Sequence, residues 1–423
     1  MSRSRSSTFA FAPLVALALA ALPMAASAQV AVSANDGKVR LDNGKVVVNK
    51  DGTETVTLID LASNPPKVIA EIKAPTSVVG PPTSVAVSPN EEIALVTSAQ
   101  KIDPADPTKQ VPNDVVTVID LGKSGGFVGN IAAKVRGKEP PAAFQPKVIA
   151  TLKAGPGAAG VSFNKAGTLA LVANRSEGTV SVFEVKGKTV TPVGERIRIG
   201  DEKSGPSAVS FTPDGKTALV TRDGDNKISV LSVQGTKVED TKRDMSAGMR
   251  PYGLDISSKG DFAVVANIGV GGGDSDTVSL IDLAANPPRV VNTVSVGQTP
   301  EGIKISPDGN YVAVSVMNGT NKAADNPFYS DKGKLVILRR TGRDLVRTAD
   351  ADVGKWCQGI AWTSNSRRLA VQCMVEEQVR CSTGTRSGSP APAPSRQAAA
   401  RPASAPPRNE PKREASAKNE TSV

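Results

Sequence analysis

The chain has 423 residues, with 51 Lys or Arg against 41 Asp or Glu, a net charge of +10 and only 3% aromatic residues. It contains no histidine, which excludes Ser-His-Asp and Cys-His catalysis, histidine general bases and the usual zinc and haem ligand sets. No basic stripe is interleaved with aromatic residues, so the composition gives no support to a nucleic-acid partner.

Residues 1–28 are predicted to be an export signal. Arg3 and Arg5 precede an apolar stretch from Phe9 to Pro23, and residues 26–28 supply the small side chains of a cleavage site. The apolar stretch is short for a membrane span. We therefore expect cleavage near Ala28 and a periplasmic or secreted mature chain with no transmembrane segment. An uncleaved N-terminal anchor is the alternative.

Residues 29–380 carry a recurring hairpin unit, which is clearest over Gly205–Val233. Two alternating runs flank a tight turn in which Pro213 presets the first corner and Gly215 accommodates left-handed backbone. A third alternating run, Lys227–Val233, follows a polar loop. Alternation with a period of two is typical of strands with one buried face.

The unit recurs along the chain, and most copies are followed by a third and a fourth run. Four strands repeated every 40–50 residues or so indicate the blades of a propeller. Two insertions rich in Pro, Gly and charge, Lys101–Asn113 and Gly122–Pro146, are predicted to be surface loops. The six hairpins are Gly80–Thr97, Gly157–Ala173, Gly205–Thr221, Pro251–Ala266, Pro300–Ser315 and Cys357–Cys373.

The N-terminal part supplies three more strands, Val30–Asn35, Glu54–Leu61 and Lys67–Lys73, which match the second, third and fourth strands of a unit. The first sheet therefore lacks its first strand. Together with the six later units, these strands predict an all-β, seven-bladed β-propeller of four-stranded antiparallel blades, with an incomplete last blade. Such a chain has open strand edges.

Residues 381–423 depart from the repeat. They are rich in Ser, Ala, Pro and Arg and nearly lack aliphatic residues, so they cannot bury enough surface to offset the entropy of ordering. We predict a disordered tail. A frameshift near Glu376 that replaced the closing strands is one origin for it, and a native flexible tail is the other.

The runs TVTLIDLASNPPKVIAEIKA and DTVSLIDLAANPPRVVNTVSVGQTPEGIKISPDGNYVAVS resemble the YVTN-type repeats of exported bacterial β-propellers. The similarity extends from about Val30 to Met374. That family shares its fold with the lactonase-like and amine-dehydrogenase-like seven-bladed propellers. The resemblance implies the fold and leaves the activity open.

Cys357 and Cys373 are equally distant from the turn centre at Asn365, so they are predicted to face each other across a strand pair. Such partners lie at a separation that a disulfide bridges, and export brings the chain into an oxidising compartment. Two reduced, buried thiols are the alternative. Cys381 remains as an odd thiol in the tail.

Two equivalent loops carry acidic pairs, Asp223 with Asp225 and Asp274 with Asp276. Carboxylates at this spacing are candidate Ca²⁺ ligands, but both twelve-residue windows lack the glutamate that completes an EF-hand loop. Asp and Gly are also the residues that turns prefer. We favour the turn interpretation and expect no metal or other cofactor.

In a propeller, the loops that enter the first strands and the loops between second and third strands gather around the central channel. Polar groups that converge there with an aromatic side chain form the default ligand site, and ordinary solvated loop residues are the alternative. The candidates are Arg175, Arg222, Arg250, Tyr252, Asn267, Glu301, Asn318, Trp356 and Gln358.

Two functions fit these features. The first is a non-catalytic propeller whose channel-face loops bind an envelope protein, a peptide or a small ligand. The absence of a recognisable catalytic constellation favours it. The second, implied only by the resemblance in fold, is a lactonase-like hydrolase in which Glu301 and Arg250 act, with Asp223 or Asp276 as metal ligands.

Overall fold

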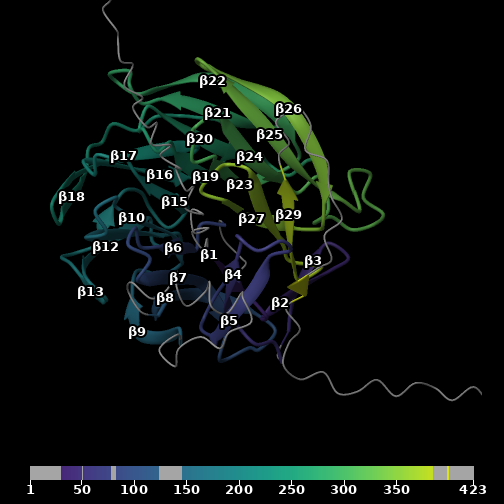
Figure 1. Ribbon diagram of the computed structural model, residues 1–423, viewed down its shortest axis with the longest axis horizontal. Coiled ribbons are helices and arrows are strands. Elements are labelled where there is room, and N and C mark those ends of the chain that lie inside the picture. Colours follow the sequence, from purple (N-terminus) through teal and green to yellow (C-terminus); the bar gives the residue numbers. More distant parts are fainter. Residues whose placement is uncertain (1–29, 50, 78–81, 123–144, 384–397, 400–423) are drawn as a thin grey trace, which may run out of the picture.

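The computed structural model describes residues 30–49, 51–77, 82–122, 145–383 and 398–399. All described elements are strands, and they form seven sheets around a common centre together with one separate hairpin (Figure 1). The expected seven-bladed propeller is therefore confirmed. The expected export signal and most of the expected tail lie outside the described residues.

Within each sheet the strands run antiparallel and follow chain order from the centre to the rim. The first sheet is β1 (Val30–Asn35), β4 (Thr55–Asp60) and β5 (Lys67–Lys73), and the separate hairpin is β2 (Val39–Asp42) with β3 (Lys45–Val48). The second sheet is β6 (Val85–Val87), β7 (Ile93–Ile102), β8 (Gln110–Asp120) and β9 (Lys147–Lys153). The third is β10 (Ala158–Phe163), β11 (Leu169–Asn174), β12 (Thr179–Lys186) and β13 (Thr189–Pro192), with β14 (Ile197–Arg198) paired to β12. The fourth is β15 (Pro206–Phe211), β16 (Thr217–Arg222), β17 (Lys227–Gln234) and β18 (Lys237–Asp240). The fifth sheet is β19 (Pro251–Ile256), β20 (Phe262–Asn267), β21 (Asp276–Asp282) and β22 (Arg289–Gly297). The sixth is β23 (Pro300–Ile305), β24 (Tyr311–Val316), β25 (Gly333–Thr341) and β26 (Asp344–Val353). The seventh is β27 (Cys357–Trp362), β28 (Arg368–Cys373), β29 (Gln378–Thr383) and β30 (Ala398–Ala399).

The core lies between neighbouring blades. Phe262 and Val264 of β20 belong to the same buried cluster as Val312 and Val314 of the next blade. Because aromatic residues are scarce, this interface is built mainly from Val, Ile, Leu and Ala, whose burial contributes roughly 1.5–3 kcal/mol for each large side chain.

The first strands of the blades share a β-bulge near their start. The pairing register shifts between Pro206 and Val209, between Pro251 and Leu254, and between Pro300 and Gly302. A bulge redirects a side chain and often lies beside a functional site. The residues just after the three prolines are Ser207, Tyr252 and Glu301, which all meet in the site described below.

Two regions, one insertion and the end of the last blade, differ from expectation. Lys101–Asn113 is not simply a surface loop, because β7 and β8 continue into it and pair as far as Ile102 and Gln110. The last blade also continues further than residue 380, since β29 pairs with β28 up to Thr383. Its fourth strand, β30, has only two residues. Much of Gly122–Pro146 lies outside the described residues.

The separate hairpin reaches across to the sixth sheet. Its turn at Asn43 accepts a hydrogen bond of 2.8 Å on Oδ1 from the N–H of Ala324, 281 positions later. Gly44 has φ +79, and a Cβ there would lie 2.4 Å from the nitrogen of Ala323, so only glycine fits this approach. The hairpin thus ties the first sheet to the long loop between β24 and β25.

Cys357 and Cys373 are direct partners across β27 and β28 and form a disulfide. Replacing both by Ser is expected to lower the free energy of unfolding by about 3 kcal/mol, because the bond closes a loop with a sequence separation of 16. Urea unfolding measures the change. A reducing agent should destabilise the native chain to the level of the variant and leave the variant unaffected; equal midpoints without reductant would contradict the prediction.

Among the described residues, no helix offers the length and apolarity needed to cross a membrane.

Candidate functional site

Two arginines from different blades share one buried aspartate on the channel face. Arg175 follows β11 and donates two hydrogen bonds to Asp223, from Nη1 to Oδ1 at 2.6 Å and from Nη2 to Oδ2 at 2.9 Å. Arg250 precedes β19 and donates from Nη2 to Oδ2 of the same carboxylate at 3.0 Å. Ser207 adds a bond to Oδ1 at 3.0 Å. A bidentate pair of this kind fixes geometry as well as charge.

The next two blades add an aromatic ring and a second carboxylate. The guanidinium carbon of Arg175 lies 5.5 Å from the centre of the Tyr252 ring, a distance typical of a cation–π contact. Gln358 donates from Nε2 to Oε2 of Glu301. Tyr252 and Glu301 are both buried. Polar side chains of five consecutive blades therefore meet at this point.

The two carboxylates have opposite electrostatic settings. Burial raises the pKa of Glu301 to about 7, although the hydrogen bond from Gln358 and the charges of Arg175 and Arg250 oppose the shift. Burial would also raise the pKa of Asp223, but hydrogen bonds from Arg175, Arg250 and Ser207 outweigh it and hold that pKa below its usual range. Asp223 is thus a fixed negative charge, whereas Glu301 exchanges a proton near neutral pH.

Trp356 and Gln358 line a cavity of about 1820 Å³, and Gln358 links that cavity to the cluster through its bond to Glu301. Its lining includes neither Glu301, which is bonded to Gln358, nor Asp223 and its two arginines. Trp356 has φ +48 and Arg250 has φ +54, in the left-handed region where Gly157 and Gly205 occupy the corresponding positions of earlier blades. Residues other than glycine are strained there and persist when their surroundings require them.

Comparisons with known proteins agree with this architecture. Residues 112–287 match the family model described as "Lactonase, 7-bladed beta-propeller". The periplasmic gluconolactonase of Pseudomonas aeruginosa is 17% identical with a TM-score of 0.59, over 85% of this chain and 94% of that one. Hydrazine synthase of Kuenenia stuttgartiensis is 18% identical with a TM-score of 0.52, over 73% and 78%. A protein of unknown function from Desulfotomaculum acetoxidans is 13% identical with a TM-score of 0.57, over 82% and 93%.

The chain is a seven-bladed propeller, and residues 112–287 of it resemble the lactonase family. At these identities the solved structures show the fold alone. No curated protein matches the chain.

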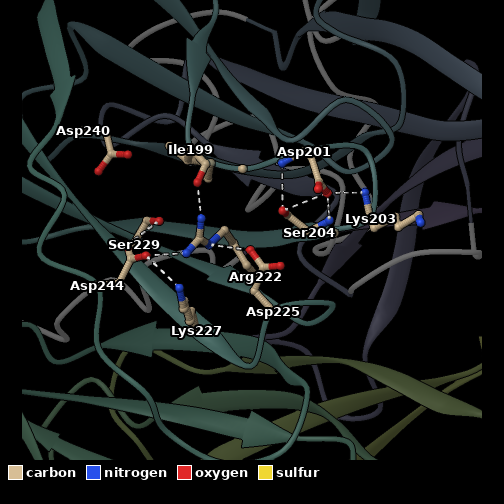
Figure 2. Close-up of polar contacts among 12 residues, drawn as sticks. Ile199, Asp201, Lys203, Ser204, Arg222, Asp225, Lys227, Ser229, Asp240 and Asp244 are labelled. Atoms are coloured by element: carbon tan, nitrogen blue, oxygen red, sulfur yellow. Dashed lines mark hydrogen bonds and ion pairs between the residues drawn. The ribbon is translucent and has the colours of Figure 1, made fainter.

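Arg222 turns away from the cluster, toward the segments that follow β14 and β18. Figure 2 shows its guanidinium among Asp244, Asp225 and the carbonyl of Ile199. Its side chain is only 5% exposed, and its Nε lies 3.3 Å from Asp225. The structure therefore uses Arg222 to join β16 to the segment after β18.

Asn267 is also engaged within its own blade. Its Nδ2 donates to the hydroxyls of Thr277 at 3.0 Å and Ser279 at 2.9 Å. Asn174 makes the same pair of bonds to Thr179 and Ser181 on β12. The residue at the end of the second strand is thus a repeated clamp onto the third strand.

Asn267→Ala is expected to lower the free energy of unfolding by about 1–3 kcal/mol, because the half-buried hydroxyl of Thr277 and the buried hydroxyl of Ser279 lose their donor. The fit of ligands to the channel should not change. Thermal or urea unfolding measures the loss; Asn318→Ala removes two bonds of a more exposed side chain and should cost less. A variant as stable as the native chain would argue against the clamp.

Asn318 and Trp356 flank the site. Asn318 holds the long loop by donating to Ser330 Oγ at 3.2 Å and to the carbonyl of Lys332 at 3.0 Å. The N–H of Trp356 donates to Thr320 Oγ1 at 3.1 Å. The indole nitrogen of Trp356 is buried, and no described hydrogen bond satisfies it.

The acidic pairs are separated by their partners. Asp223 binds two arginines and Asp225 lies beside Arg222, so neither faces a shared point. Asp276 Oδ2 accepts the N–H of Thr299 at 2.8 Å, and burial together with the charge of Asp274 raises the pKa of Asp276. In the described part of the chain, no three acidic or Cys side chains gather into a group suited to a metal ion.

Two residues of this site were not predicted in their roles from the sequence. Asp223 was considered only as a metal ligand, and Ser207 was not among the candidate site residues. The signal for Ser207 was its position after Pro206, which matches Tyr252 after Pro251 and Glu301 after Pro300.

Proposed function

We propose that this lactonase-like propeller hydrolyses lactones on its channel face, with Glu301 as the general base. The supporting observation is a buried carboxyl whose pKa is about 7 and which feels the charges of Arg175 and Arg250. A general base works best when its pKa lies near the operating pH. The match of residues 112–287 to the lactonase family model supports the same proposal independently of the pKa of Glu301.

The chemistry requires no histidine. A water molecule attacks the lactone carbonyl while Glu301 accepts one of its protons, and a guanidinium stabilises the negative oxygen that develops. The ring C–O bond then breaks, and the carboxylic acid form of Glu301 returns the proton to the leaving alkoxide. The product is an open hydroxy acid. Asp223 keeps Arg175 and Arg250 in place during these steps.

The substrate we favour is a lactone of a polyhydroxy acid. Gln358, which is bonded to Glu301, and Trp356 line the cavity, and they offer an amide for hydroxyl groups and an aromatic face for the ring. A simple alkyl lactone offers no hydroxyl to the amide oxygen of Gln358, which disfavours its binding.

A non-catalytic binding site is the second candidate. It is favoured by the extent to which the polar groups already satisfy one another, since both arginines bind Asp223 and Gln358 binds Glu301. In that case the channel face recognises an envelope protein, a peptide or a small ligand without turning it over.

The deciding experiment assays the purified mature chain against five- and six-membered sugar-acid lactones and against unsubstituted lactones of the same ring size. We expect turnover of the polyhydroxy lactones above the spontaneous rate. Calorimetry with the corresponding hydroxy acids is run in parallel. Binding without any turnover would support the second candidate, and neither turnover nor binding would contradict both.

A further inference from the structure

The first sheet has an open inner edge. In the six other sheets, a first strand lies between the second strand and the channel, but within the described residues β1 pairs only with β4. By register β1 is a second strand, because Asn35 pairs with the first residue of β4 as Asn174 pairs with the first residue of β12. Figure 1 shows β1 near the centre, among the first strands of the other blades.

The burial of β1 differs from that of its counterparts. Every residue of β11 and of β20 is buried, whereas five of the six residues of β1 are only half-buried. The cavity of about 1820 Å³ is lined by all six residues of β1 and by parts of β6, β27 and β28. One side of this cavity therefore lies along β1.

The hydrogen-bonding groups on this edge can be assigned from β11. The carbonyl of Leu169 accepts the N–H of Asn164, so Leu169 and every second residue after it point toward the first strand of that blade. By the same alternation, the main-chain N–H and C=O groups of Val30, Val32 and Ala34 face the space beside β1. The carbonyl of Ala34 accepts a bond of 3.0 Å from Nε2 of Gln372 on β28, as expected for a group that faces the space.

Aliphatic side chains contribute to both walls of the space. Val32 and Ala34 pack with Val85 against a buried cluster on one side. On the other side, Ala31, Ala361 and Val379 pack against the cluster of Ile59, Leu61 and Ala370. An inserted strand would therefore meet aliphatic side chains on both faces, polar side chains such as Gln372, and a row of main-chain groups on one edge.

The existing first strands indicate what the space accepts. Their third residue is small, as in Gly253 and Gly302, because a Cβ would lie 2.2 Å from the carbonyl oxygen of Glu301 and 1.8 Å from that of Gln358 in the next blade. Their fourth residue is aliphatic, as in Leu254 and Ile303, and it is buried. The space continues these blade interfaces, so the same sequence pattern fits it.

We propose that the edge of β1 binds an extended segment of a partner protein, which adds to the first sheet as its missing inner strand. The segment has a small third residue and aliphatic fourth and sixth residues, as in Pro300–Ile305. Residues 384–423 of this chain are poor candidates, since apart from Ala and Pro their only aliphatic residue is Val423. Residues 1–28 are expected to be removed on export, so the proposed occupant is a separate chain.

The test uses the full mature chain and a synthetic peptide that copies residues 299–306. We expect saturable 1:1 binding and slowed hydrogen exchange at the amides of Val30, Val32 and Ala34. A peptide with Val in place of the glycine should bind at least tenfold more weakly, because the added side chain meets the next blade. A peptide N-methylated on its β1-facing edge should do the same.

Val32→Pro removes one open-edge N–H without removing a bond to β4, and it should abolish binding while the unfolding midpoint stays close to that of the native chain. Because this variant can also fail to fold, the N-methylated peptide provides the same test on the unmodified protein. No binding, or binding without protection of β1, would overturn the proposal. Binding that appears only after residues 384–423 are deleted would overturn it as well, since the tail would then be the occupant.

Discussion

Glu301→Gln is expected to reduce lactone hydrolysis by about 10²–10⁴-fold, the range that a positioned general base contributes. The substitution keeps the size of the side chain and leaves Gln358 with an oxygen to bind. KM should change less than kcat, because the carboxylate acts mainly in the transition state. Steady-state kinetics on the best polyhydroxy lactone measures both. Asp274→Asn, in an exposed neighbouring loop, is the matched control and should retain full activity.

The pH profile gives a second readout of the same residue. Activity should rise as pH increases through about 7, because Glu301 must lose its proton to act as a base. Stability should change in the opposite direction. Burial raises the folded-state pKa above its ordinary value of 4.5, so the contribution of Glu301 to stability is fully present below pH 4.5 and is lost as pH rises to about 7. Glu301→Gln should remove that part of the pH dependence; unchanged profiles would refute the role.

Asp223→Asn is expected to lower the free energy of unfolding by about 3–5 kcal/mol, because it removes the shared carboxylate of two arginines. The site also becomes more positive, so the pKa of Glu301 should fall and the rise in activity should move below pH 7. Chemical unfolding and the pH profile measure the two effects.

Asp225→Asn is the control for Asp223→Asn within the same loop. Its partner Arg222 keeps its bonds to Asp244 and to the carbonyl of Ile199, so the loss should stay within about 1 kcal/mol. Equal losses of unfolding free energy in the two variants would mean that Asp223 with its two arginines contributes no more to stability than the Arg222–Asp225 pair.

Most of the strands could be predicted from the sequence because alternation and turn residues are local signals. Val30–Asn35 and Lys67–Lys73 have the predicted bounds, and Lys227–Gln234 exceeds its prediction by one residue. The hairpin of β2 and β3 was missed, since its short runs carry no repeat signature. The extension of β7 and β8 was missed because Pro and charged residues indicated a loop.

The candidate site was predictable in position but not in its pairings. Sequence repetition brings the loop after β16 to the channel face, yet two neighbouring residues of that loop point in different directions. Arg222 pairs with Asp244 inside its own blade, whereas Asp223 pairs with arginines of two other blades. Such choices depend on charges distant in the chain, which a local pattern does not contain.

The bond between the β2–β3 turn and Ala324 has a consequence for how fast the protein folds. Its two ends are 281 positions apart, so it cannot form until the blades between them have assembled. Contacts of such long range carry a large loop-closure entropy and slow folding. We therefore expect the two ends of the ring to meet in a late kinetic phase, after the middle blades have become protected from exchange.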